Sequence, residues 1–281
     1  MDLRTRWYQS AGIRAAQPVG AMHGPGLWFE PTLQPHVSHP VVVAQQAETE
    51  LLRRALARYL SGTVALELAC VNHVTQSIAD GSFPLAVTSA MKVTALQVYC
   101  DEGYHALWAM ELCDELGASS TPGQPGFLQK LEALLIDRKD PGWVRFLFTV
   151  VTETALSSNL VTLARSEALH PAIRRFVAEH ARDEARHRVL FTQYFTHCWA
   201  QLSADERADA LVLLPKLVDA FLAPDAEAIR SDLAAVGLTR PEVDDVMKDS
   251  WSAHKIRAEI ERGAKPTLSA LAAAGAIIGA Q

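Results

Sequence analysis

Two histidines and one glutamate lie at a spacing that suits a metal ion. His180, Glu184 and His187 follow the pattern His-x-x-x-Glu-x-x-His. On an α-helix, where each residue turns by about 100°, the three side chains fall within an arc of roughly 60°. Imidazole and carboxylate groups that project together toward an apolar core need a partner, and a metal ion suits both. This stretch therefore predicts a metal site on one face of a helix.

A second, shorter pattern of the same kind lies upstream. Glu102 and His105 form Glu-x-x-His within a segment, residues 85–117, that is predicted to be helical. Residues three apart are neighbours on one helix face. A single Glu-x-x-His is common by chance, so this pair alone indicates little.

Two further glutamates are the only charges inside apolar stretches. Glu67 lies in a helix predicted over residues 44–79, and Glu153 lies in one predicted over residues 143–168. A helix that is apolar all round is a buried helix. A carboxylate there must reach solvent, pair or bind a cation. For Glu67 the ligand and structural interpretations are equally open, whereas the setting of Glu153 favours a ligand.

Four helices, the last predicted over residues 170–199, carry these groups in the order Glu, Glu-x-x-His, Glu, Glu-x-x-His. Dimetal carboxylate proteins with a ferritin-like four-helix bundle use this inventory. We therefore predict an all-α fold with a ferritin-like four-helix bundle. The candidate metal ligands and catalytic residues are Glu67, Glu102, His105, Glu153, His180, Glu184 and His187.

Carboxylates and imidazoles in this ratio suit a pair of iron ions. Two cations a few ångströms apart repel each other strongly in a core of low dielectric constant. Four carboxylates offset that charge, and two of them can bridge the ions. Imidazole suits iron and leaves positions open for dioxygen, and His180 gives one metal a second imidazole. We predict two Fe ions, which Mn could replace in a recombinant sample, and O2 as co-substrate.

Each Glu-x-x-His unit is preceded by an aspartate, Asp101 or Asp183. An acid there can accept the second N–H of a ligand histidine and fix its tautomer. The alternative is an ordinary acid on a helix surface. Arg186 lies close to these acids in the sequence, and it either pairs with them or is solvated.

Composition limits the classes of function. The chain has 281 residues, 49% of them hydrophobic, and a net charge of −6. A negative net charge does not indicate the basic surface that binds nucleic acid. No stretch of about 18 consecutive apolar residues predicts a membrane helix, and the first residues lack the apolar run of a signal peptide. The four cysteines form no Cys-x-x-Cys pair. We expect reduced cysteines and a cytoplasmic location.

We predict one helical domain over residues 1–281, with accessory C-terminal helices after the bundle. The expected parts are an irregular arm at 1–43, a diiron bundle at 44–200 and accessory helices at 201–281, including 204–222, 225–235 and 240–262. In the arm, His23, His36 and His39 favour surface or capping roles. The chain has neither a Gly-x-Gly-x-x-Gly fingerprint nor a cysteine set for an iron–sulfur cluster, so electrons must come from a separate reductase or from the substrate.

With its ligand order and its His-x-x-x-Glu-x-x-His helix, the chain resembles the p-aminobenzoate N-oxygenase (AurF-type) family of ferritin-like diiron oxygenases over about residues 45–200. The resemblance implies that the seven candidates bind Fe2, that the protein is a homodimer, and that it oxygenates the nitrogen of a small-molecule amine, often an aryl amine. Three alternatives stay open: a diiron oxidase acting at carbon, an iron-binding protein without turnover, and a bundle with structural buried acids.

Two related classes fit the sequence less well. Ribonucleotide reductase small subunits resemble this ligand set, but they usually carry a radical tyrosine one turn after the first ligand histidine, where this chain has Ala109. A diiron oxidase with a heme-oxygenase-like fold would not need Glu67. We therefore regard Glu67 as the residue that separates the two folds.

Overall fold

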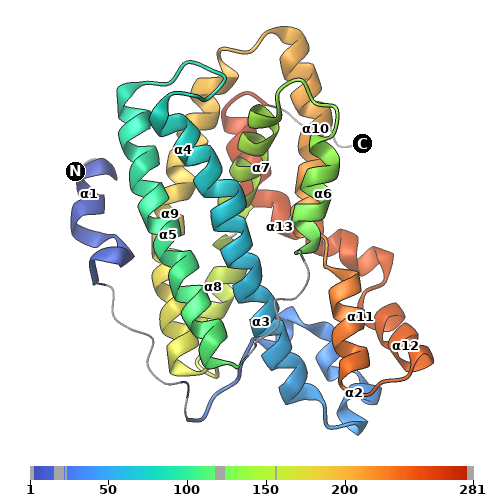
Figure 1. The fold of residues 1–281 in the computed structure, drawn as a ribbon. Coiled ribbons are helices and arrows are strands. Elements are labelled where there is room, and N and C mark those ends of the chain that lie inside the picture. Colours follow the sequence, from blue (N-terminus) through green and yellow to red (C-terminus); the bar gives the residue numbers. More distant parts are fainter. Residues whose placement is uncertain (1–2, 16–21, 23, 118–123, 156, 277–281) are drawn as a thin grey trace.

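The computed structural model describes residues 3–15, 22, 24–117, 124–155 and 157–276. In these residues the secondary structure is helical, apart from one isolated β-bridge between Leu27 and Leu169 (Figure 1). The all-α prediction is therefore confirmed.

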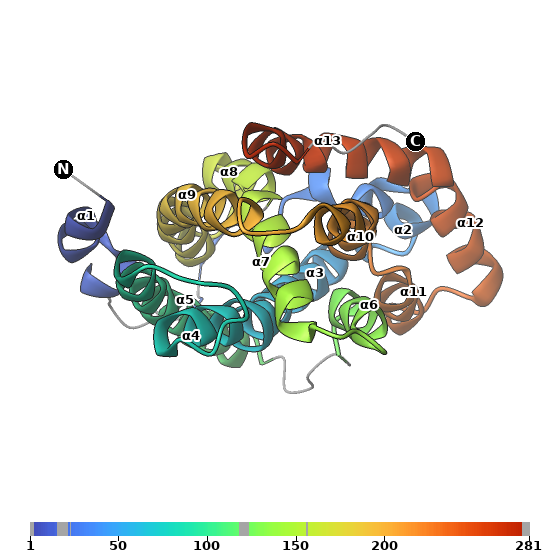
Figure 2. The ribbon, with the colours of Figure 1, turned by 90° about the horizontal axis from the view of Figure 1, so that it is seen from above.

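Four long helical segments form the bundle (Figures 1 and 2). They are the interrupted helix α3 (Glu48–Leu66), η4 (Glu67–Val71) and α4 (Asn72–Asp80); α5 (Ser89–Glu115); α7 (Pro141–Ala155), which is followed by α8 (Ser157–Arg165); and α9 (Pro171–Trp199). α5 packs against the interrupted helix and against α9, α9 packs against α7, and α7 contacts η4 and α4, which closes the ring.

Local sequence sets several ends of these helices. The Thr88 hydroxyl accepts a hydrogen bond from the Met91 N–H and so caps α5. His170 caps α9 through the Ala172 N–H, as its place before Pro171 predicts. Gly81, with φ of 86°, ends α4 in the left-handed conformation that glycine adopts without strain.

The helix that is apolar all round is buried, as predicted. α10 (Ala204–Leu222) and α13 (Ala253–Ala273) pack against α7, and α6 (Gly126–Leu135) packs against both α7 and α10. The stretch Pro141–Arg165 is long and apolar enough to cross a membrane, but 86% of its most apolar window is buried inside the protein. Core helices share this composition, so the stretch is weak support for a membrane span.

The C-terminal helices differ from the prediction at one point. α11 (Ala226–Ala235) lies where it was expected, but the helix predicted over 240–262 is two helices, α12 (Arg240–Ser250) and α13. The chain breaks because Ser252 takes an extended N-cap conformation, with ψ of 153°. α13 then continues through Pro266 to Ala273, beyond the predicted end at residue 262.

The N-terminal arm is less irregular than predicted. It contains α1 (Leu3–Ser10) and α2 (Pro40–Ala44), with the 3-10 turns Gly12–Ala15, Pro31–Leu33 and Pro35–Ser38. The expectation of a surface or capping role was wrong for His36, which is fully buried, accepts a hydrogen bond from the Trp251 indole and has its pKa lowered by burial to about 4. His39 caps α2 as expected, and His23 lies outside the described residues.

Two apolar clusters fill the bundle, one toward each end. One contains Val71 of η4 and Val98 of α5, and the other contains Leu60 of α3 and Trp108 of α5. On each of the four segments, the candidate ligands fall in the sequence between members of the two clusters. The layout places the ligands at the waist of the bundle, away from solvent. The single-domain organisation stays a prediction.

A buried aromatic contact tests this packing. Phe148 is fully buried, and its ring centre lies 6.2 Å from that of Phe127 and 6.0 Å from that of Phe221. Phe148→Ala removes these contacts and leaves a cavity, so the free energy of unfolding should fall by about 3–5 kcal/mol. Urea denaturation measures it. The matched change Val212→Ala, at a position that is 65% exposed, should cost less than about 0.5 kcal/mol. Equal losses of unfolding free energy in Phe148→Ala and Val212→Ala would contradict this packing.

Candidate metal centre

The structure brings all seven candidate ligands together in the interior. None of them is more than 2% exposed. They come from η4, α5, α7 and α9, one position or unit from each segment of the bundle. Two other histidines of the bundle helices lie away from this cluster: His73 is exposed, and Nε2 of His197 lies 2.9 Å from the Ala86 carbonyl oxygen.

A π-helical turn places Glu67. Glu67 is the first residue of η4, and its carbonyl accepts the N–H of Asn72, five residues on, instead of the fourth-residue bond of an α-helix. Such single turns inside α-helices occur frequently at functional sites. Apolar residues flank Glu67 on both sides, so the sequence predicted a continuous helix and missed this turn.

The side chains form two groups that share two glutamates. In each group the ligand atoms all lie within 4.8 Å of one another. One group is Glu67, Glu102, His105, His180 and Glu184, and the other is Glu102, Glu153, Glu184 and His187. Because Glu102 and Glu184 belong to both groups, they stand where carboxylates would bridge two ions. His180 belongs to the first group only, so that group has two imidazoles.

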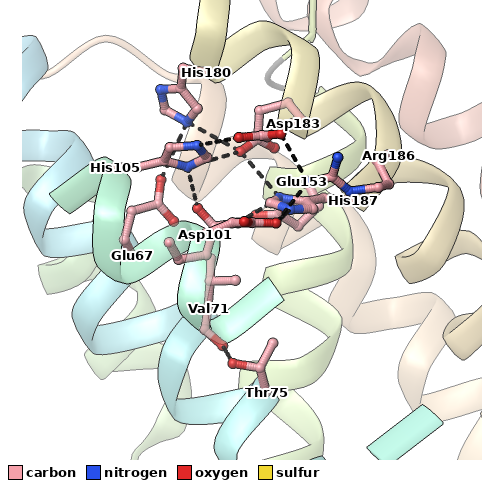
Figure 3. Close-up of polar contacts among 12 residues, drawn as sticks. Glu67, Val71, Thr75, Asp101, His105, Glu153, His180, Asp183, Arg186 and His187 are labelled. Atoms are coloured by element: carbon pink, nitrogen blue, oxygen red, sulfur yellow. Dashed lines mark hydrogen bonds and ion pairs between the residues drawn. The ribbon is translucent and has the colours of Figure 1, made fainter. Parts of the chain in front are cut away.

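The imidazoles face the carboxylates at close range. Nδ1 of His187 lies 2.6 Å from one carboxylate oxygen of Glu102, and Nδ1 of His105 lies 2.7 Å from the other. Nε2 of His180 lies 3.1 Å from Glu184. The same atom lies 3.7 Å from Glu67 (Figure 3). Nδ1 is therefore the ring atom that His105 and His187 direct into the cluster.

Several buried oxygens of the cluster lack a hydrogen-bond donor among the described residues. Both carboxylate oxygens of Glu67 and of Glu153, and one oxygen of Glu184, are in this state. Buried polar atoms are ordinarily satisfied, and leaving a charged one unsatisfied costs several kcal/mol. Cations bound among these oxygens would satisfy all of them. The donor set of hard carboxylates and imidazoles fits a dimetal centre.

The glutamates fall into two electrostatic classes. Burial and the neighbouring carboxylates raise the pKa of Glu67 and of Glu153 well above its ordinary value. For the two shared glutamates burial acts in the same direction, but the histidines outweigh it. His187 and His105 lower the pKa of Glu102, and hydrogen bonds from His180 and His187 lower that of Glu184. The shared pair thus favours the ionised form that bridging requires.

The two aspartates hold the ligand histidines crosswise. Asp183 of α9 lies 3.3 Å from Nε2 of His105 on α5, and Asp101 of α5 lies 3.1 Å from Nε2 of His187 on α9 (Figure 3). Burial disfavours the charged ring of His105, but Glu102 and Asp183 outweigh this effect and raise its pKa to about 10. Each acid thus binds Nε2 of a histidine on the opposite helix and orients its ring so that Nδ1 faces the cluster.

Arg186 joins the two aspartates and is not solvated. Its guanidinium donates to Asp101 at 2.7 Å and to Asp183 at 2.8 Å. Two residues that the sequence did not mark as site residues also reach these acids, namely Trp7 and Gly12 of the N-terminal arm. No local pattern could have found them, because more than 90 residues separate each from its acid.

A cavity of about 840 Å³ reaches the candidate centre, with Glu67 and His180 among its lining residues. Tyr59, Thr63 and Leu160 line it too, and so do three arginines of α3, Arg53, Arg54 and Arg58. Arg58 precedes Glu67 by nine positions on α3 and η4, a rise of about 14 Å. The cavity is large enough for a small organic molecule beside the cluster.

Replacing Glu153 by Gln should reveal the cost of the buried carboxylates in protein freed of metal by a chelator. The pKa of Glu153 is higher in the folded protein than its ordinary value of 4.5. Its contribution to stability is therefore full below pH 4.5 and is lost as the pH rises toward the pKa of the folded state. Gln cannot ionise, so the variant should gain stability relative to the wild type between pH 5 and pH 8 in urea denaturation. Glu111→Gln, at an exposed position of α5, should show no such trend. If Glu153→Gln changed the free energy of unfolding equally at pH 5 and at pH 8, the raised pKa of the buried Glu153 carboxyl would be refuted.

Removal of His180 should affect one group only. His180→Ala deletes an imidazole from the first group and leaves Glu102, Glu153, Glu184 and His187 in place. Bound divalent metal, measured by elemental analysis, should fall from two ions to about one per chain, with helix content unchanged. His73→Ala is the matched control and should keep both ions. An unchanged metal content in His180→Ala would count against His180 as a ligand.

Comparison with known proteins agrees with this geometry. The chain is 24% identical over 222 residues to a protein of Streptomyces thioluteus described as 4-aminobenzoate N-oxygenase, an alignment that covers 74% of this chain. The chain spans only 65% of the length of that relative. The family model described as P-aminobenzoate N-oxygenase AurF matches residues 17–275. The chain therefore belongs to the p-aminobenzoate N-oxygenase family.

Proposed function

We propose that the protein is an O2-dependent diiron oxygenase that N-oxygenates a small amine, with an aryl amine as the expected substrate class. The observation that carries the proposal is the buried, two-group Glu/His cluster at the wall of a large cavity, in a chain of this family. The named activity of the relative supports the reaction type. The seven residues of the cluster are the proposed metal ligands.

The chemistry of the ligands follows from their geometry. When bound, two iron ions would supply the electrons and open positions with which dioxygen is activated. Glu102 and Glu184 would hold both ions, while Glu67 with His105 and His180 would complete one site, and Glu153 with His187 the other. The crosswise aspartates keep Nδ1 of His105 and His187 directed at the ions.

The cavity gives the amine access to one side of the centre. Glu67 and His180 are the ligands that line it, so the amine nitrogen would approach the group with two imidazoles. Leu66 and Leu160 supply apolar walls beside these ligands. Such walls exclude water from the reacting atoms and limit side reactions.

Electrons and partners belong to the same proposal. Because the sequence carries no flavin, nicotinamide or iron–sulfur fingerprint, we propose that a separate reductase or the substrate supplies the electrons. A homodimer and a cytoplasmic location remain expectations of this proposal.

Rapid mixing tests the proposed function. Protein loaded with Fe(II) without oxygen is mixed with O2, with and without an aryl amine, while absorbance is recorded and products are identified by mass spectrometry. We expect a transient visible band that decays faster with the amine, together with an oxygenated nitrogen in the product. A hydroxylated or dehydrogenated carbon would instead indicate an oxidase acting at carbon. Many irons per chain without substrate-dependent O2 uptake would indicate a storage protein.

A variant that narrows the cavity links this activity to the site. Gly62 lines the cavity, and a Cβ there would meet nothing closer than 3.9 Å. Gly62→Leu should therefore fold and bind metal normally, yet lower kcat/KM for the amine by about tenfold or more, because the added side chain occupies substrate space. Gly103→Leu is the matched control. A Cβ at this helical glycine would meet nothing within 4 Å outside its own stretch of helix, and the variant should keep the wild-type kcat/KM. Equal kcat/KM in both variants would exclude the cavity as the substrate site.

A further inference from the structure

The N-terminal arm covers the outer side of the acids that hold the ligand histidines. Its first helix, α1, packs against α5, and the 3-10 turn Gly12–Ala15 packs against both α5 and α9 (Figure 1). Most of α1 is exposed, but Trp7 is only 9% exposed and points inward. One polar side chain of the bundle also reaches α1, since the Gln97 amide donates to the Arg4 carbonyl at 3.3 Å.

The arm makes one hydrogen-bonded contact with each of the two aspartates. The Trp7 indole N–H lies 2.8 and 2.9 Å from the two carboxylate oxygens of Asp101. The backbone N–H of Gly12 donates to Asp183 at 3.0 Å. These contacts are charge-assisted and buried, which makes them stronger than ordinary neutral hydrogen bonds.

Each aspartate that the arm contacts also contacts one of the ligand histidines. Asp101 lies against Nε2 of His187, and Asp183 lies against Nε2 of His105. Arg186 binds both aspartates, so the arm, the acids and the guanidinium form one connected network. A displacement of the arm would therefore loosen both histidines through the two aspartates.

The turn after α1 has room for glycine only. A Cβ on Gly12 would lie 2.7 Å from the carboxylate oxygen of Asp183, closer than such atoms approach each other. That oxygen cannot retreat freely, because His105 and Arg186 hold the same carboxylate. A side chain at this position would push either the acid or the arm out of place.

We propose that the N-terminal arm is a positioning element for both ligand histidines, and that its docking is coupled to metal binding. The inference rests on the metal site of the proposed function but not on the reaction. Coupling is reciprocal: if the docked arm strengthens metal binding by some factor, bound metal strengthens docking by the same factor. The described part of the arm thus supports the metal site through the aspartates that hold its histidines.

Metal affinity tests the first half of the proposal. Trp7→Phe removes the indole donor, and Gly12→Ala displaces Asp183. Competition with a coloured chelator should show Co(II) binding weakened about 10- to 100-fold in each variant, the range found when partners of ligand histidines are lost. The visible spectrum of bound Co(II) should change as well, because the imidazoles are reoriented. Ser10→Ala is the matched control, since its hydroxyl bonds only to the Arg6 carbonyl within α1, and it should behave as wild type.

Limited proteolysis tests the reciprocal half. Arg4 and Arg6 are exposed trypsin sites on α1. When opening is fast relative to cleavage, the cleavage rate reports the population of undocked arm. In the wild type and in Ser10→Ala, Co(II) should slow release of the N-terminal peptide, measured by mass spectrometry. In Trp7→Phe and Gly12→Ala this protection should shrink by the factor by which affinity fell.

The outcomes separate this proposal from the proposed function. If Trp7→Phe and Gly12→Ala bind Co(II) as the wild type does, and cleavage is indifferent to metal, the arm proposal fails while the metal site stands. If the coupling is observed but no amine is oxidised, the proposed function fails and the arm proposal stands. A wild-type protein that binds no metal would overturn both.

Discussion

Mutual repulsion of four buried carboxylates is the constraint on which the rest of the structure depends. Glu67, Glu102, Glu153 and Glu184 meet in the interior, each no more than 1% exposed. Burying such charges without compensation costs several kcal/mol each. The protein meets this cost in two ways. Three histidines face the carboxylates directly, and two metal ions would neutralise the remainder. A cluster of this kind is unfavourable as a structural core and favourable as a metal site.

The fold keeps the four carboxylates apart from the apolar side chains that stabilise the bundle. Each of the four helical segments places its polar residues at the waist and its apolar residues toward both ends, so the two apolar clusters stabilise the bundle on either side of the site. α10 and α13 cover α7, which keeps Glu153 from water. The geometry of the site is therefore held by residues that take no part in its chemistry.

The sequence predicted what depends on short-range periodicity and missed what depends on distant contact. The order of the ligands, the helices that carry them and the burial of α7 follow from spacing within single segments. The sequence could place Asp101 and Asp183 beside a histidine, but not show that each serves the histidine of the other helix, because that pairing depends on how α5 and α9 face each other. The roles of Trp7 and Gly12 and the burial of His36 depend likewise on the tertiary arrangement. The break at Ser252 is instead a local N-cap that the predicted helix 240–262 overran.

The π-helical turn at Glu67 has a consequence for the architecture as a whole. It carries one more residue between hydrogen-bonded partners than an α-helical turn, and one residue corresponds to a rotation of about 100°. The helix before the turn contributes Leu51, Leu56 and Leu60 to one apolar cluster, and the helix after it contributes Val74 and Ile78 to the other. Leu66, the last residue before the turn, already belongs to the second cluster, so the segment passes from one cluster to the other where the turn begins. Glu67 thus lies at the boundary between the two apolar clusters, and there its carboxylate belongs to the polar group with Glu102 and Glu184.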